Sequence, residues 1–283
     1  PFLFWKAFVF IKYILEVVIV KKILKLKHVF MDKVWGYEKW IASTHKNGIS
    51  LIHDEDKNLL EYLGKELPIL IKEIKSDDSL SVQVHPSDIY AKEYENDNGK
   101  TECWFILEAK DDATLICGID SGLNRDKLKG LIEDKNLESV LKRIKVNVGD
   151  MIYIPAGTVH AIEGGIKLLE VQQCSDVTYR IYDWGRDREV HIEKSLDVIN
   201  FGGGNGEGVI KNFKILNTEY FTVEKIFVNG KNNFECNSDY NIYYFLSGEG
   251  TVCEEGGIES LNIEKGDSIY IMNGTKYSML SIN

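Results

Sequence analysis

The sequence predicts a mainly β protein made of two jelly-roll barrels with a few helical insertions, and three observations support this fold class. Many short runs rich in Val, Ile, Tyr and Phe alternate with Gly, Asn and Asp, which is typical of sandwiches and barrels. Helical spacing occurs in few segments. One stretch is repeated, because VGDMIYIPAGTVHAI at 148–162 resembles KGDSIYIMNGTKYSM at 265–279. The repeat predicts the same strand–turn–strand unit in both halves.

The expected elements follow in order along the chain. Strands are predicted at 49–54, 67–74, 80–85, 102–108, 113–119, 143–148, 151–155, 166–173, 177–184, 221–228, 241–250, 251–255 and 268–272. Helices are predicted at 87–97, 124–144 and 191–201, where apolar residues recur at a spacing of about 3.6 residues. In the first of these, Ser87 and Asp88 follow Pro86 and favour a helix start.

Composition suggests where the domains divide. The segment GGGNGEG at 202–208 has the composition of a flexible linker. We therefore expect a larger catalytic barrel with a helical insertion at 24–201 and a smaller barrel without a metal site at 209–283. Residues 1–23 are expected to form an amino-terminal extension of uncertain order.

Charge and cysteine content exclude several classes of protein. The 283 residues carry a formal net charge of −10, which argues against nonspecific binding of nucleic acid. Lys6, Lys12 and Glu16 interrupt the apolar amino end, so no membrane span is expected. The five cysteines are never in a C-x-x-C spacing, which fits reduced thiols in a cytoplasmic protein rather than a disulfide framework. We expect a monomer or a weak homo-oligomer.

One repeat carries a histidine that its counterpart lacks. In GDMIYIPAGTVH, the Gly-Asp pair predicts a hairpin turn, and the Pro-Ala-Gly run then turns His160 toward the barrel interior. The spacing G-x5-P-x-G-x2-H, from Gly149 to His160, matches the second motif of the cupin superfamily. Four fixed positions coincide with the predicted strand pattern, so we interpret His160 as a candidate metal ligand.

Partners for His160 occur on two other predicted strands. Gln83 and His85 are two residues apart on an extended segment, so their side chains project from the same face. Glu102 begins an apolar strand, and burying a carboxylate there without a partner would be costly. Two imidazoles, a carboxylate and an amide oxygen suit a borderline divalent ion such as zinc, with one ion expected per chain.

The second repeat does not contain such a set. Its sequence places Tyr277 where the first has His160, and no histidine follows His191. Asn241 is the nearest counterpart of Glu102 when Tyr243–Leu246 is aligned with Trp104–Leu107. We therefore expect the second half to be a metal-free packing module.

A longer series of motifs is more specific than the cupin match. SVQVHPSDIYA, GKTECWFIL, IYIPAGTVHAI, LLEVQQCSDVTYRIYDW and HIEKSLDVI occur in this order, and from about Leu24 onward the chain resembles type I mannose-6-phosphate isomerase in its short bacterial form. The resemblance implies that Gln83, His85, Glu102 and His160 bind one zinc ion. It also implies that Arg180 is catalytic and that Lys100 lies in the active site.

The resulting hypothesis is a zinc-dependent aldose–ketose isomerase that interconverts D-mannose 6-phosphate and D-fructose 6-phosphate through an enediol-type intermediate. An iron-dependent cupin dioxygenase is an alternative, because two histidines and a carboxylate also suit non-haem iron. A non-enzymatic sugar-binding cupin is a third possibility. The WGRDRE segment at 184–189 is a compact version of a loop that is longer in the family, and this difference bears on how the sugar phosphate is held.

Overall fold

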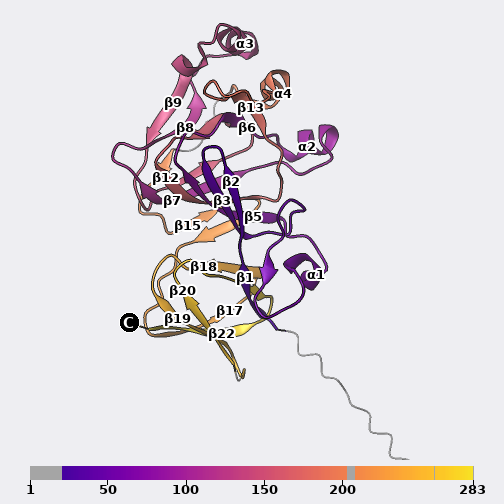
Figure 1. Ribbon diagram of the computed structural model, residues 1–283, viewed down its shortest axis with the longest axis vertical. Coiled ribbons are helices and arrows are strands. Elements are labelled where there is room, and N and C mark those ends of the chain that lie inside the picture. Colours follow the sequence, from indigo (N-terminus) through magenta and orange to yellow (C-terminus); the bar gives the residue numbers. More distant parts are fainter. Residues whose placement is uncertain (1–20, 203–207, 258, 283) are drawn as a thin grey trace, which may run out of the picture.

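The computed structural model describes residues 21–202, 208–257 and 259–282. Its β-rich halves are arranged along the long axis of the molecule (Figure 1). Within the described residues, no helix is both long and apolar enough to cross a membrane. The structure confirms the predicted fold class, since strands dominate and helices are few and short.

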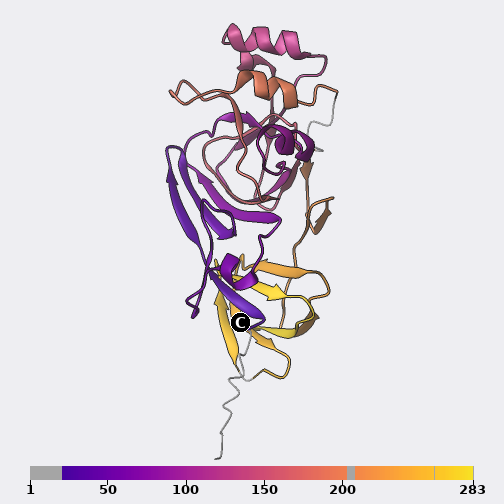
Figure 2. The ribbon, with the colours of Figure 1, turned by 90° about the vertical axis from the view of Figure 1, so that its right-hand side faces the viewer.

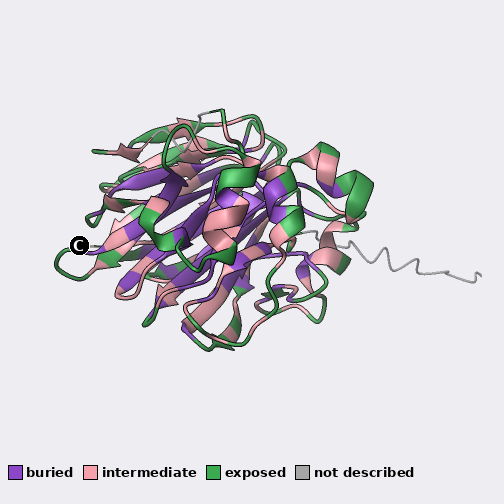
Figure 3. Ribbon diagram, turned by 90° about the horizontal axis from the view of Figure 1, so that it is seen from above, coloured by how far each residue is buried: buried purple, intermediate pink, exposed green. Residues whose placement is uncertain are grey.

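The first half consists of two facing sheets. The seven-stranded sheet contains, in spatial order, β14 (Val209–Ile210), β10 (Met151–Ile154), β7 (Glu102–Ala109), β12 (Ile166–Gln173), β5 (Ile69–Ser76), β3 (Gly36–Ala42) and β2 (Val29–Lys33). The five-stranded sheet contains β13 (Tyr179–Tyr182), β6 (Val82–Val84), β11 (His160–Ile162), β8 (Thr114–Ile119) and β9 (Leu141–Lys145). Trp104 of the first sheet and Leu115 of the second are buried in one apolar cluster between them. Figure 3 shows the buried strands in the interior, with exposed and partly exposed helices lying over them and exposed loops around them.

The second half also contains two sheets. One has the order β18 (Tyr240–Tyr244), β21 (Ser268–Met272), β1 (Ile23–Lys27) and β4 (Leu51–Ile52). The other has the order β17 (Lys231–Glu235), β22 (Lys276–Ile282), β19 (Glu249–Glu254) and β20 (Ser260–Glu264). A separate pair is formed by β15 (Ile215–Asn217) and β16 (Thr222–Glu224). Ile269 and Met279, from the two four-stranded sheets, lie in one buried cluster.

Each half contributes one strand to a sheet of the other half. β1, near the amino end, pairs with β21 of the second half, and Figure 2 shows this indigo strand beside the yellow ones. In return, β14, which follows the predicted linker, pairs with β10 of the first half. β10 and β21 are the repeated strands, so the exchange is reciprocal. The two halves therefore share hydrogen-bonded sheets, and the boundaries at 24–201 and 209–283 stay predictions.

The repeated stretch has the same backbone geometry in both halves. Gly149 and Gly266, which precede β10 and β21, have φ of 90° and 91°. This left-handed region is adopted readily only by glycine. After the strand, the amide of Gly157 donates to His85 O at 2.9 Å, and that of Gly274 donates to Cys236 O at 2.8 Å. The predicted strand–turn–strand unit is thus present twice.

All three predicted helices are present, but one of them is much shorter than predicted. α2 (Asp88–Tyr94) and α4 (Ile192–Val198) lie within the predicted ranges. The helix predicted over 124–144 is wrong beyond Glu133, where α3 (Arg125–Glu133) ends. Lys135 then takes a φ of 55°, a short 3-10 turn η1 (Leu137–Val140) follows, and β9 pairs with β8. Strand pairing outweighed the helical spacing of these residues.

A local signal accounts for one of the other differences. The sequence analysis missed α1 (Leu59–Leu63), although Asn58 and Glu61 form a capping box that an N-x-x-E pattern could have suggested. The strands predicted at 49–54 and 221–228 are reduced to β4 and β16. Most of the predicted extension at 1–23 and of the linker at 202–208 lies outside the described residues.

Candidate metal centre

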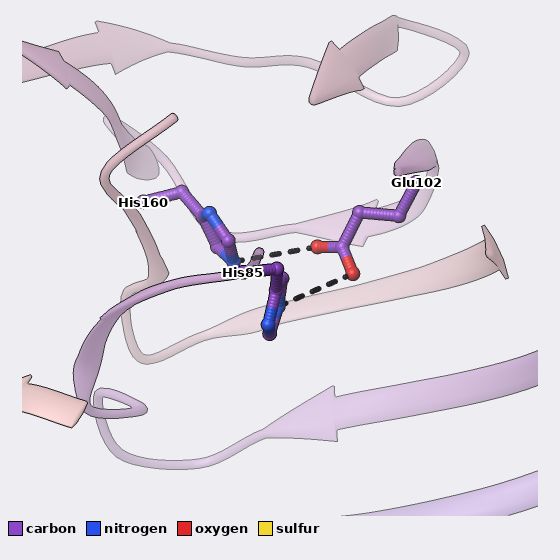
Figure 4. A group of neighbouring side chains, drawn as sticks. All are labelled: His85, Glu102 and His160. Carbon is purple, nitrogen blue, oxygen red and sulfur yellow. Dashed lines mark ion pairs between the residues drawn. The ribbon is translucent and has the colours of Figure 1, made fainter. Parts of the chain in front are cut away.

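Three of the predicted ligands meet between the two sheets of the first half. His85 follows β6, and His160 begins β11 of the same sheet. Glu102 begins β7 of the opposite sheet, and its carboxylate points toward both imidazole rings (Figure 4). All three side chains are at most 1% exposed. The ligand atoms of the three residues lie within 4.8 Å of one another, which is close enough for one ion.

Backbone contacts orient both rings. His85 Nδ1 lies 2.9 Å from the carbonyl oxygen of Val177, and His160 Nδ1 lies 2.8 Å from that of Thr158. A carbonyl oxygen can only accept, so each Nδ1 carries the proton and each Nε2 directs a lone pair into the interior. His85 Nε2 and both Glu102 oxygens make no hydrogen bond within the described part of the chain. This donor set therefore fits a divalent cation.

Burial sets the charge of the cluster. It lowers the pKa of His160 to about 4 and the pKa of His85 well below its usual value, so both rings are neutral near pH 7. Burial, with the nearby charge of Glu170, also raises the pKa of Glu102 to about 7. A buried cation would reverse that shift, because it favours the ionised carboxylate. Neutral imidazoles and a carboxylate are the forms in which these side chains bind metal.

Gln83 also reaches the cluster. It is the register partner of His160, and its Nε2 lies 3.3 Å from His160 Nε2. An amide binds a metal through its oxygen, so ligation by Gln83 would require the amide to turn its Oε1 toward the histidines. The structure places Gln83 beside the two histidines with its amide nitrogen facing His160.

The two predicted catalytic cations belong to opposite sides of the first half. Lys100, two residues before Glu102, is buried, and its Nζ lies 3.3 Å from Glu102 Oε2. Arg180 of β13 is the register partner of Gln83, so its side chain leaves the same face of the five-stranded sheet. One of its terminal nitrogens donates to Glu189 O at 2.6 Å, and its buried Nε has no hydrogen-bond partner among the described residues.

A second buried charge cluster was missed by the sequence analysis. Lys72 of β5 lies 3.3 Å from Glu170 of β12, and Glu170 accepts a hydrogen bond from the indole of Trp104 at 3.0 Å. Burial opposes charging of Lys72, but Glu38 and Glu170 outweigh it and raise the pKa of Lys72. Trp104 stacks edge-on against His160, with 5.4 Å between the ring centroids, so this cluster adjoins the metal ligands. The signal was a charged residue at an inward position of an apolar strand.

The second half has the equivalent positions but different residues. Asn241 pairs with Ile271 as Glu102 pairs with Ile154, and Tyr277 pairs with Phe234 as His160 pairs with Gln83. Cys236 occupies the position of His85, as the matching contacts to Gly274 and Gly157 show. Tyr277 stacks on Phe234 and is hydrogen-bonded to Tyr243, with 2.5 Å between the hydroxyls. Side chains therefore fill the space where the first half gathers its ligands.

Comparisons with known proteins agree with this architecture. The family model for the mannose-6-phosphate isomerase cupin domain matches residues 209–281. The crystal structure of mannose 6-phosphate isomerase from Bacillus subtilis superposes with a TM-score of 0.80 at 28% identity and covers 93% of this chain and 100% of that one. A putative mannosephosphate isomerase from Archaeoglobus fulgidus has the same fold, with a TM-score of 0.77 at 21% identity over 92% of this chain and 94% of that one.

Curated relatives match over most of their length. A mannose-6-phosphate isomerase of Streptococcus mutans is 33% identical over 266 residues, which cover 84% of this chain and 83% of the relative. A mannose-6-phosphate isomerase of Bacillus subtilis is 32% identical and covers 89% of this chain and 93% of the relative. These matches span both halves and the segments that carry the buried cluster. The chain belongs to the type I mannose-6-phosphate isomerase family.

Proposed function

We propose that this protein is a zinc-dependent aldose–ketose isomerase that interconverts D-mannose 6-phosphate and D-fructose 6-phosphate through an enediol-type intermediate. The observation that carries the proposal is the buried cluster of His85, Glu102 and His160 in a chain of this family. Two solved structures of the same fold are described as zinc-bound mannose 6-phosphate isomerases. The charged interior is an environment for a polar, anionic substrate, whereas a cupin dioxygenase acting on an apolar substrate would not require it.

Zinc is the ion that we propose for the centre, with one per chain. His85, His160 and Glu102 would hold it through two imidazole nitrogens and a carboxylate, and Gln83 would add its amide oxygen. Catalytic zinc sites can expand to five ligands, so these four protein ligands would leave a position for a substrate oxygen. Bound zinc would supply a Lewis acid that lowers the cost of negative charge on the sugar oxygens during isomerisation.

We assign electrostatic roles to the two cations. Interconversion of an aldose and a ketose moves a proton between C1 and C2 while negative charge develops on the adjacent oxygen. Arg180 remains protonated, and its planar guanidinium can hold two oxygens of the open-chain sugar phosphate at once. Lys100 is held beside Glu102, where its ammonium can stabilise the same developing charge or bind the phosphate. Both are therefore proposed as catalytic residues.

The remaining assignments concern the chain as a whole. We propose 24–201 as the catalytic half and 209–283 as a metal-free half that supports it through shared strands. All five cysteines are unpaired, which fits a reducing compartment, so we place the enzyme in the cytoplasm. A monomer or weak homo-oligomer is proposed as the working form, with a small sugar phosphate as its partner.

Activity and proton transfer can be tested in one experiment. Purified protein is incubated with fructose 6-phosphate in D2O, and the mannose 6-phosphate formed is analysed by NMR. An enediol route should introduce solvent deuterium at C2 of the product, because the proton exchanges while it is held by the protein. Deuterium at C2 would support the enediol route over a direct hydride shift, and absence of product would contradict the isomerase assignment.

A further inference from the structure

Gln172 is a buried amide in the same layer of the interior as the metal ligands. It lies on β12 directly opposite Glu102 of β7 in the sheet register, so both side chains project from the same face. Two residues earlier on that face is Glu170, which is paired with Lys72. The exposed fraction of Gln172 is 0%. A fully buried polar side chain beside Glu102 requires hydrogen-bond partners for both ends of its amide.

Among the described residues, one end of that amide has hydrogen-bond partners and the other has none. The Nε2 atom lies 2.8 Å from the carbonyl oxygen of Gln173 and 2.7 Å from that of Ser175. Both are acceptors, so the amide nitrogen must face them and the amide cannot be rotated without losing two hydrogen bonds. The opposite atom, Oε1, is buried and has no hydrogen-bond partner within the described residues. Gln172 thus holds an acceptor oxygen in a fixed direction.

The nearby cations already have carboxylate partners. Lys100 is paired with Glu102, and Lys72 is paired with Glu170. An amide oxygen accepts but does not donate, so its missing partner is a hydrogen-bond donor or a metal ion, and Gln83 is already the amide proposed for the metal. A phosphate dianion has no proton to offer, whereas each hydroxyl of a sugar chain does. The unpaired oxygen is therefore suited to a hydroxyl of the substrate and not to its phosphate.

We propose that Gln172 Oε1 accepts a hydrogen bond from a hydroxyl on the carbon chain of the bound sugar phosphate and thereby contributes to specificity for polyhydroxylated substrates. This inference rests on the proposed isomerase function. It gives the β12 strand a role in substrate recognition beside its role in the sheet. A site built to bond a hydroxyl discriminates strongly against an analogue that lacks it, because the buried acceptor is then left unpaired.

Gln173, the next residue, provides a matched control. It is also buried, but both ends of its amide have protein partners. Its Oε1 accepts from the amide of Thr101 at 2.8 Å, and its Nε2 donates to Asp88 at 3.1 Å. Replacing Gln173 should affect stability through these contacts without removing an acceptor from the interior face.

The test compares Gln172→Met and Gln173→Met with the parent, using mannose 6-phosphate and its 3-, 4- and 5-deoxy analogues. Bound metal and melting temperature are measured for each protein. We expect Gln172→Met to retain metal and to lose about 10-fold in kcat/KM for mannose 6-phosphate. For the parent and for Gln173→Met, one deoxy analogue should have a much lower kcat/KM than mannose 6-phosphate. For Gln172→Met, the kcat/KM of that analogue should equal that of mannose 6-phosphate.

Two results would overturn the proposal. One is a Gln172→Met enzyme whose kcat/KM for mannose 6-phosphate equals that of the parent. The other is a Gln172→Met enzyme whose kcat/KM falls by the same factor for mannose 6-phosphate and for all three deoxy analogues. Should Gln172→Met not fold, a crystal structure of the parent with an open-chain hexitol 6-phosphate decides the question. A hydroxyl within hydrogen-bond distance of Gln172 Oε1 supports the proposal, and an Oε1 bonded elsewhere contradicts it. An inactive parent would instead contradict the proposed function.

Discussion

In His160, Nδ1 donates a hydrogen bond to the backbone, and Nε2 directs its lone pair into the interior. The Thr158 carbonyl fixes the tautomer of His160, and the turn at Gly157 fixes the position of the backbone that carries this ring. His85 is held in the same way by Val177. The ligands are therefore preorganised by hydrogen bonds that do not depend on metal.

Removal of either imidazole should abolish metal binding without unfolding the protein. We expect His85→Ala and His160→Ala to contain only background metal and to lose more than about 100-fold in kcat, because the remaining ligands do not hold the ion. His53→Ala, outside the cluster, is the control and should retain both. Metal analysis and circular dichroism check the prediction. Stoichiometric metal in either site variant would refute the assignment of the ligands.

Arg180→Lys should separate catalysis from metal binding. An ammonium cannot reproduce the planar fork of a guanidinium, so we expect roughly tenfold or greater loss of kcat with normal metal content. Arg125→Lys, on an exposed ion pair with Asp197, is the control. Turnover is measured at saturating mannose 6-phosphate. If turnover were the same in both variants, Arg180 would be a charge without a catalytic role.

At the scale of elements, His28 connects the loop between β1 and β2 to β21. The Ser268 hydroxyl donates to the carbonyl of Ile41, so its oxygen accepts from His28 Nε2 at 2.9 Å. Burial, reinforced by the charge of Lys39, lowers the pKa of His28 to about 4. This contact links the two halves through a neutral imidazole.

The contact should make stability depend on pH. Because the pKa is lower in the folded state than the unfolded value of about 6.5, the unfolded chain binds more protons between these pH values. Stability contributed by neutral His28 is thus present above about pH 6.5 and falls as the pH decreases toward 4. His28→Gln, which keeps a donor for Ser268, should flatten the melting temperature over this range. An identical pH profile in the variant would contradict this role.

The repeated turn in the second half gives another prediction. Tyr277→His should not create a second metal site, since the equivalent positions hold Phe234, Cys236 and Asn241. The variant should bind one ion per chain, like the parent, and isomerise at a similar rate. It should lose on the order of 2 kcal/mol of stability, because the Tyr277 ring is buried and bonded to Tyr243. Two ions per chain in the variant would show that this half retains a binding site.

For the whole molecule, the sequence predicted local features better than pairings between distant segments. The duplicated turn, the β-rich fold and the cluster of His85, Glu102 and His160 follow from motifs in which spacing fixes side-chain direction. The exchange of β1 and β14 does not, because pairing between strands far apart in the sequence depends on the assembled fold. The Lys72–Glu170 pair was missed because each residue alone resembles a surface charge.

The dependence of activity on bound metal tests the account most directly. The parent protein is treated with a chelator, and residual metal and isomerase activity are measured on the same samples before and after titration with Zn²⁺. We predict that activity falls in proportion to bound metal and returns fully at one equivalent of Zn²⁺ per chain. Full activity in protein that contains no bound metal would contradict the claim that His85, Glu102 and His160 form a catalytic metal centre.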